Sequence, residues 1–178
     1  PDTDSFVLVH IGAEVTDVAS VHKDVLVDLG SFPEGKHFVY RNLAKKMGVM
    51  PAETPSLLKN FFEEKSSSKQ TLKINEALGE IGKAWLTSFG ETLKEVYADT
   101  PLPKQVFLTA DNDLIDWFSS ILVQKEFDEL ILSGTFTVTN IDDDFLTTYL
   151  SREKHVIDID PFLGLGAIFL KKSLYEAQ

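Results

Sequence analysis

Three short strand-like segments near the N-terminus constrain the fold more than any other part of the sequence. Residues 6–11 form an apolar, β-branched run, residues 15–21 alternate between polar and apolar side chains, and a third run covers residues 25–28. The two links between them, 12–14 and 22–24, are only three residues long. Links of this length join antiparallel neighbours. The segment therefore predicts a three-stranded β-meander.

The first link has a second property that concerns binding. Gly12, Ala13 and Glu14 form a tight turn, and Thr16 follows at the start of the next strand. Such a turn brings consecutive backbone N–H groups and the threonine hydroxyl toward one point. The turn is therefore a candidate anion-binding cradle.

Length and charge restrict the classes of function. The chain has 178 residues, 43% of them apolar, which is enough for one domain with a hydrophobic core. The net charge of −11 argues against a nucleic-acid surface and against direct binding to an anionic membrane. Cysteine is absent, which fits a reducing compartment. No apolar run approaches the roughly 20 residues of a transmembrane helix. We therefore expect a cytoplasmic chain without direct membrane insertion.

After the meander the apolar spacing becomes helical. Helices are predicted at 34–47, ended by Gly48, and at 56–64, with a polar connector at 65–69. The strongest helical pattern covers 70–98, where one apolar stripe consists of Ile74, Leu78, Ile81, Trp85, Phe89, Leu93 and Val96. The two aromatic residues of this stripe are expected in the core.

Strands and helices alternate over the remainder of the chain. Strands are predicted at 105–109, 129–133, 135–138 and 155–158, and helices at 111–123, 142–150 and 162–175. Asp111 or Asn112 is the expected N-cap of the first of these helices. The predicted fold class is α/β, with a mixed five-stranded sheet flanked by helices.

Three motifs carry a resemblance to a known family. Residues 10–17 are similar to the phosphate-binding turn of the actin-like ATPase superfamily, with Gly12, Thr16 and Asp17 matching. Residues 108–113 correspond to the strand–helix adenosine motif of that superfamily, and residues 160–170 are similar in shape to the helix that ends an FtsA-type lobe. Element order and motifs together resemble the second lobe of these proteins, most closely the FtsA and PilM type.

The resemblance implies an RNase-H-like lobe over residues 1–178, with a helical insertion around 51–69, as part of a larger two-lobed protein. It also implies a site for ATP with Mg²⁺. The residues expected at that site are Gly12, Ala13, Glu14, Thr16, Asp17, Thr109, Ala110, Asp111 and Asn112.

Departures from the family pattern work against nucleotide binding. His10 stands where the family has an aspartate near the metal, and Mg²⁺ prefers hard oxygen ligands. Ala110 and Asp111 replace glycines against which the nucleotide would lie, and Glu14 stands where an anion would sit. We therefore expect ATP binding to be weak or absent, with no catalytic residue.

The function implied is that of a cytoplasmic scaffold in a membrane-associated cell-division or type IV pilus assembly. Such a protein works through protein partners, self-association included, and reaches the inner membrane only through them. Two alternatives stay open: a small-molecule kinase of the same superfamily, and an acidic α/β interaction domain with no nucleotide.

Other polar clusters have simpler explanations than metal binding. The acidic run 142–144 is typical of a first helical turn, where the helix dipole favours carboxylates. Asp158 and Asp160 are expected to close a strand ahead of a proline. The four histidines have no metal-ligand spacing. No metal site is predicted.

Overall fold

The computed structural model describes residues 5–23, 25–99, 101–123 and 135–141. The chain divides into two compact units, Pro1–Thr139 and Asn140–Gln178. The strands predicted at 129–133 and 155–158, and the helices predicted at 142–150 and 162–175, lie outside the described residues. So do the acidic run 142–144, Asp158, Asp160 and His155.

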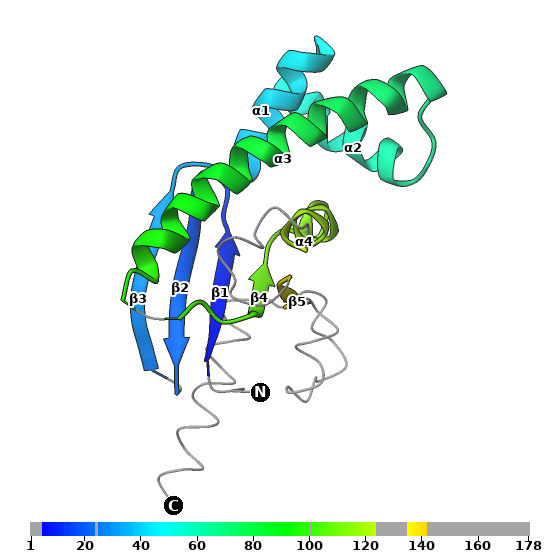
Figure 1. The fold of residues 1–178 in the computed structure, drawn as a ribbon. Coiled ribbons are helices and arrows are strands. Elements are labelled where there is room, and N and C mark those ends of the chain that lie inside the picture. The colour runs from blue at the N-terminus through cyan, green and yellow to red at the C-terminus, as the bar shows by residue number, and fades with distance from the viewer. Residues whose placement is uncertain (1–4, 24, 100, 124–134, 142–178) are drawn as a thin grey trace, which may run out of the picture. The chain divides into compact units, whose positions relative to one another are not determined.

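The sheet has five strands in the order β3-β2-β1-β4-β5. The strands are β1 (Ser5–Ile11), β2 (Thr16–His22), β3 (Val25–Phe32), β4 (Gln105–Thr109) and β5 (Thr137–Asn140). The first three pair antiparallel as a meander, whereas β1 and β4 are parallel (Figure 1). The prediction of a mixed, five-stranded α/β sheet is confirmed, although β3 runs four residues past its predicted end.

Within the described residues, four α-helices connect and cover these strands: α1 (Lys36–Met47), α2 (Thr54–Phe62), α3 (Ser68–Val96) and α4 (Ile115–Leu122). A short 3₁₀ turn, η1 (Pro51–Glu53), precedes α2. Helix α1 ends at Gly48, whose φ of 70° is the left-handed conformation that glycine adopts most readily.

The predicted N-cap of α4 is wrong. Asp111 and Asn112 precede the helix by several residues, and Leu114 is the N-cap, without a side-chain cap hydrogen bond. The carbonyl oxygen of Asp111 instead accepts hydrogen bonds from the amides of Leu114 and Ile115. Residues 111–114 therefore form a turn, and the side chain of Asp111 is free to make a tertiary contact.

The core lies between the sheet and α3. Trp85 and Phe89 have no exposed surface, as the apolar stripe predicts, and their rings stack with centroids 5.1 Å apart. Gly30 of β3 lets α3 approach closely. A Cβ at this position would lie 2.7 Å and 2.8 Å from methyl groups of Thr92 and Val96. The long helix is thus held directly against the meander.

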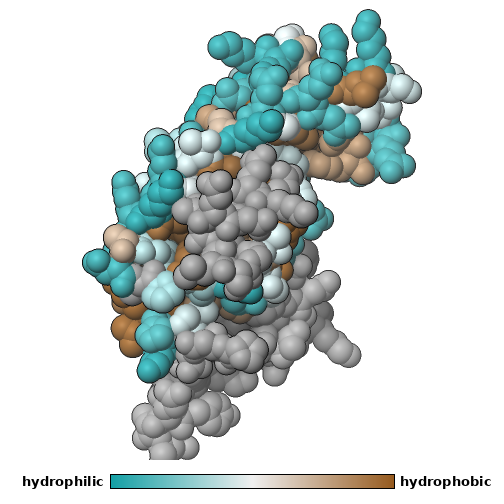
Figure 2. Space-filling model, viewed as in Figure 1, coloured by the Kyte–Doolittle hydropathy of each residue, from teal (hydrophilic) through white to brown (hydrophobic). Residues whose placement is uncertain are grey.

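The outer strand β3 exposes an apolar strip. Val25, Leu26, Val27 and Leu29 are each at least half exposed, and brown atoms mark this edge at the lower left of Figure 2. The register shifts between Ser20 and Val21 on β2, which indicates a β-bulge, and the Asp28 carboxylate accepts a hydrogen bond from the Leu29 amide. Bulges and charged groups of this kind limit edge-to-edge pairing.

The parallel pairing of β1 and β4 places two loops at one edge of the sheet. His10 near the end of β1 is in register with Thr109 at the end of β4, and with Asp17 on β2. The β1–β2 turn and the loop that follows β4 therefore start beside each other.

Candidate functional site

The structure brings the two predicted groups of site residues to the same edge of the sheet. Asp17, His10 and Thr109 form one row across three strands, and the His10 Nδ1 atom lies 3.5 Å from the Thr109 hydroxyl oxygen. Residues 12–14 form the β1–β2 turn, and residues 110–112 follow β4. Whether these residues bind a ligand stays a prediction, but their proximity is a property of the fold.

The β1–β2 turn is closed by the chain's own backbone. The Gly12 amide donates to the Val15 carbonyl over 2.9 Å. The carbonyl oxygens of residues 12–14 accept hydrogen bonds of 2.8–3.0 Å from the amides of residues 35–37. The first amides of a helix have no partner within the helix and often bind anions. Here the amides at the start of α1 are already used by the turn.

Gly35 makes this close approach possible. A Cβ at Gly35 would lie 2.5 Å from the Gly12 carbonyl oxygen and 2.7 Å from the Val15 amide nitrogen. Both neighbours are backbone atoms of the turn, so they have little freedom to move aside. Only glycine fits at this position without displacing the turn.

A buried hydrogen-bond network holds the turn from the core side. Thr16 is fully buried, and its hydroxyl donates to the Glu34 carbonyl over 2.8 Å. The Trp85 indole N–H donates to the same carbonyl over 3.0 Å and lies 3.3 Å from the Thr16 hydroxyl oxygen. The Thr16 hydroxyl therefore faces the core rather than the outer side of the turn.

On the outer side, Glu14 is held by two basic residues of α1. The Arg41 Nη1 atom lies 2.9 Å and 3.1 Å from the two carboxylate oxygens, and the His37 Nδ1 atom lies 3.0 Å from one of them. Hydrogen bonds from His37 and Arg41, with their charge, hold the pKa of the Glu14 carboxyl below its ordinary value. The carboxylate thus occupies a small basic clamp.

The same helix reaches the loop that follows β4. Lys36 forms an ion pair with Asp111, and the Tyr40 hydroxyl donates a hydrogen bond to the Asp113 carboxylate. Burial, reinforced by Asp113, raises the pKa of the Tyr40 hydroxyl. Residues four apart lie on one helix face. The pair 36/40 therefore connects α1 to the loop that follows β4. The pair 37/41 connects α1 to the β1–β2 turn.

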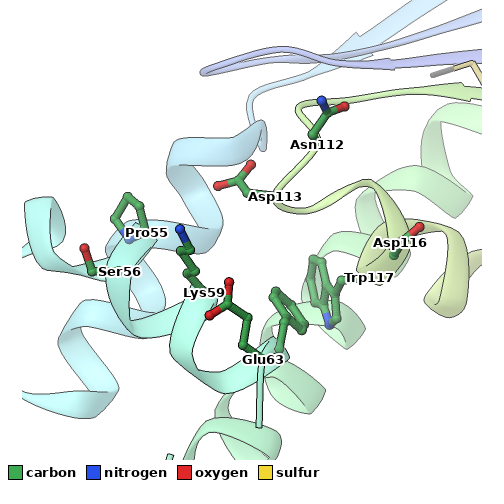
Figure 3. A pocket seen from close by; sticks show the side chains of 9 residues that line it. Pro55, Ser56, Lys59, Glu63, Asn112, Asp113, Asp116 and Trp117 are labelled. Atoms are coloured by element: carbon green, nitrogen blue, oxygen red, sulfur yellow. The ribbon is translucent and has the colours of Figure 1, made fainter. Parts of the chain in front are cut away.

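A pocket of about 600 Å³ lies beside the loop that follows β4, called the second loop below. Residues from α2 line one side, and the loop and α4 line the other, with Lys59, Glu63, Asp113 and Trp117 labelled in Figure 3. Its size is within the range of small-molecule sites. This lining combines an aromatic ring with several carboxylates. It favours a planar ligand that carries N–H donors over a phosphate, because carboxylates repel phosphate.

Among the residues that make these contacts, only those of the two loops were predicted from the sequence. Lys36, His37, Tyr40 and Arg41 were missed, because their spacing is also typical of the solvated face of a helix. Trp117 and Lys59, which line the pocket, were also missed. The partners of the α1 residues become visible only when the loops and α1 are placed together.

The described residues contain no group of three or more His, Asp or Glu side chains arranged to hold a metal ion. Within the same residues, no helix is long and apolar enough to cross a membrane.

The fold has counterparts among solved structures. PilM in a PilM–PilN type IV pilus biogenesis complex aligns with a TM-score of 0.53 and 12% identity, over 79% of this chain and 37% of that one. The apo ParM protein of pSK41 aligns with a TM-score of 0.53 and 10% identity, over 96% of this chain and 43% of ParM. This chain has an actin-like fold.

A third structure extends the likeness. It is the activator of 2-hydroxyisocaproyl-CoA dehydratase from Clostridium difficile, solved with bound ADPNP. The alignment covers 99% of this chain, with a TM-score of 0.50 and 13% identity. The alignment covers 64% of the activator, so the chain spans less than two thirds of each of these proteins. No family model matches the chain, and no curated protein matches it in sequence.

Proposed function

We propose that this chain is one lobe of an actin-like scaffold protein that works through protein contacts and binds ATP weakly or not at all. The observation that carries the proposal is the closed state of the β1–β2 turn. Its carbonyls bond the amides of residues 35–37, and Glu14 fills the basic clamp at its outer side.

The second loop supports the same conclusion. Asp111 follows β4 at the point where a nucleotide would approach the backbone, and its carboxylate is exposed and paired with Lys36. Arg41 and Lys36 are already paired with the carboxylates of Glu14 and Asp111. The Asp113 carboxylate accepts a hydrogen bond from the Tyr40 hydroxyl. A triphosphate would have to compete with these carboxylates for the cations, so the residues present do not fit Mg²⁺-ATP well.

We propose the kind of assembly in which this chain works from its similarity in fold to PilM. PilM was solved in a complex with PilN of the type IV pilus biogenesis system. We extend to this chain a role of the same kind, in pilus assembly or in cell division. In this proposed role the protein works in the cytoplasm and reaches the membrane through partners. A scaffold uses nucleotide as a structural element or switch, which tolerates a poor site.

Thermal unfolding of the full-length natural protein, with and without Mg²⁺-ATP, tests the proposal. A ligand that binds only the folded state adds RT ln(1 + [L]/Kd), which is about 0.4 kcal/mol when the concentration equals Kd. At 1 mM Mg²⁺-ATP we expect the melting temperature to rise by less than about 2 °C. MgCl₂ with sodium sulfate at the same ionic strength is the control. A rise of about 5 °C or more over that control would contradict the proposal.

A further inference from the structure

The contact between Glu14 and α1 has the geometry of a bound anion. Arg41 meets both oxygens of the carboxylate, and His37 meets one of them. The three side chains are 45–58% exposed, so solvent and solutes reach the clamp. A guanidinium beside an imidazole binds phosphate oxygens as readily as carboxylate oxygens.

We propose that His37 and Arg41 form a site for a phosphate-bearing ligand, and that Glu14 is an internal competitor that fills it. Neither α1 residue belongs to the motifs through which the sequence resembles actin-like ATPases. The inference rests on the proposed function, because it supplies a cause for the weak binding of nucleotide.

Because Glu14 is tethered beside His37 and Arg41, it has an advantage over any free ligand that competes for them. Glu14 lies on a turn that is bonded to the start of α1, so its carboxylate stays beside the clamp. A tethered group acts at an effective concentration on the order of millimolar or higher. At equal intrinsic affinity, a free phosphate ester at micromolar concentration therefore occupies the clamp far less than Glu14 does. Exposed ion pairs contribute little to stability, so removing the competitor leaves the fold intact and the clamp open.

A neutral substitution at Glu14 tests the proposal. Wild-type protein and Glu14→Gln are titrated calorimetrically with inorganic pyrophosphate at about 50 mM salt. The variant is expected to bind at least about tenfold more tightly, because one carboxylate no longer competes and charge repulsion falls. Adding Arg41→Gln to this variant is expected to abolish the gain.

Glu80→Gln is the matched control. Glu80 is also an exposed carboxylate, and it pairs with Lys46 in the last turn of α1, away from the β1–β2 turn. This change raises the net charge by the same amount, and the variant is expected to bind pyrophosphate like the wild type. Equal gains in the Glu14 and Glu80 variants would overturn the proposal, because net charge alone would then be responsible.

The remaining outcomes separate this inference from the proposed function. If the Glu14 variant stays folded by circular dichroism but gains no affinity, Glu14 is not a competitor, although weak ATP binding by the wild type would still stand. If the wild type itself binds Mg²⁺-ATP at micromolar concentration, the proposed function fails and the internal competitor fails with it.

Discussion

The two sides of the β1–β2 turn differ in burial and in chemistry. On the core side, Thr16 and Trp85 are fully buried and share hydrogen bonds with the Glu34 carbonyl. On the outer side, Glu14, His37 and Arg41 are about half exposed and form ion pairs. We therefore expect the core side to fix the shape of the turn and the outer side to determine whether the turn binds a ligand. Substitutions should affect stability on one side and binding on the other.

The largest effect on stability is expected for Trp85→Ala. The ring stacks on Phe89 and lies against Phe32 and Phe118, with no exposed surface. Its removal should cost about 3–5 kcal/mol. Trp85→Phe keeps most of the ring but loses the indole donor, and should cost about 1–2 kcal/mol. Urea denaturation measures both. A loss below about 1 kcal/mol for the alanine variant would show that the core side does not fix the turn.

The next effect is expected for Gly35→Ala. The added methyl group would collide with backbone atoms of the turn and should cost about 1–3 kcal/mol. Gly79→Ala is the control, because no atom lies within 4 Å of a Cβ at this exposed position in α3. That change should stabilise the helix by about 0.5–1 kcal/mol. If the denaturation midpoint shifts in the same direction for both variants, the close approach of the turn to the start of α1 would be contradicted.

Glu34 lies between the two sides and gives a pH-dependent prediction. Burial raises the pKa of its carboxyl; a hydrogen bond with Ser88 partly offsets this rise, and the charge of Glu91 adds to it. The Oε2 atom of Glu34 is buried without a hydrogen-bond partner. A raised folded-state pKa favours the protonated form. The stability that this group contributes is therefore present below the unfolded-state pKa and lost as the pH rises through the folded-state pKa.

Glu34→Gln should consequently be more stable than the wild type at pH 7, by less than about 1 kcal/mol since the group is only partly buried. The advantage should vanish near pH 4, where the wild-type carboxyl is protonated. Urea midpoints of both proteins at the two pH values provide the measurement. A difference that does not change with pH would refute the assignment.

The smallest effect on stability is expected on the outer side. Glu14→Gln breaks only exposed contacts, and we expect the melting temperature to change by less than about 2 °C. The same change is the one expected to alter pyrophosphate binding most. A melting temperature lowered by more than about 5 °C would show that the outer side also holds the turn, and the comparison would fail.

The fold followed from local signals in the sequence. Alternating residues and short links in the first strands, and the apolar stripe around Trp85, each act within a few turns of chain. The N-cap of α4 was predicted wrongly because a tertiary partner overrides the local preference. The Asp111 carboxylate pairs with Lys36, which is 75 residues away.

The candidate site followed only in part. The motifs singled out the Gly12 turn and residues 109–112, and the structure places His10 and Thr109 in register, at the strand ends where these two segments begin. Ligand binding by these residues stays a prediction. The contribution of α1 did not follow, because Glu14 and Arg41 are separated by 27 residues and their spacing carries no local signal. Long-range contacts of exposed charged residues are decided by the placement of whole elements.

Amide hydrogen exchange at Gly35, Lys36 and His37 tests the central claim most directly. These amides bond the carbonyls of residues 12–14. The account predicts slow exchange in the full-length protein without nucleotide, and the same rates after addition of 1 mM Mg²⁺-ATP. Exchange as fast as in an unstructured peptide, or protection that develops only with Mg²⁺-ATP, would contradict a turn closed by the chain itself.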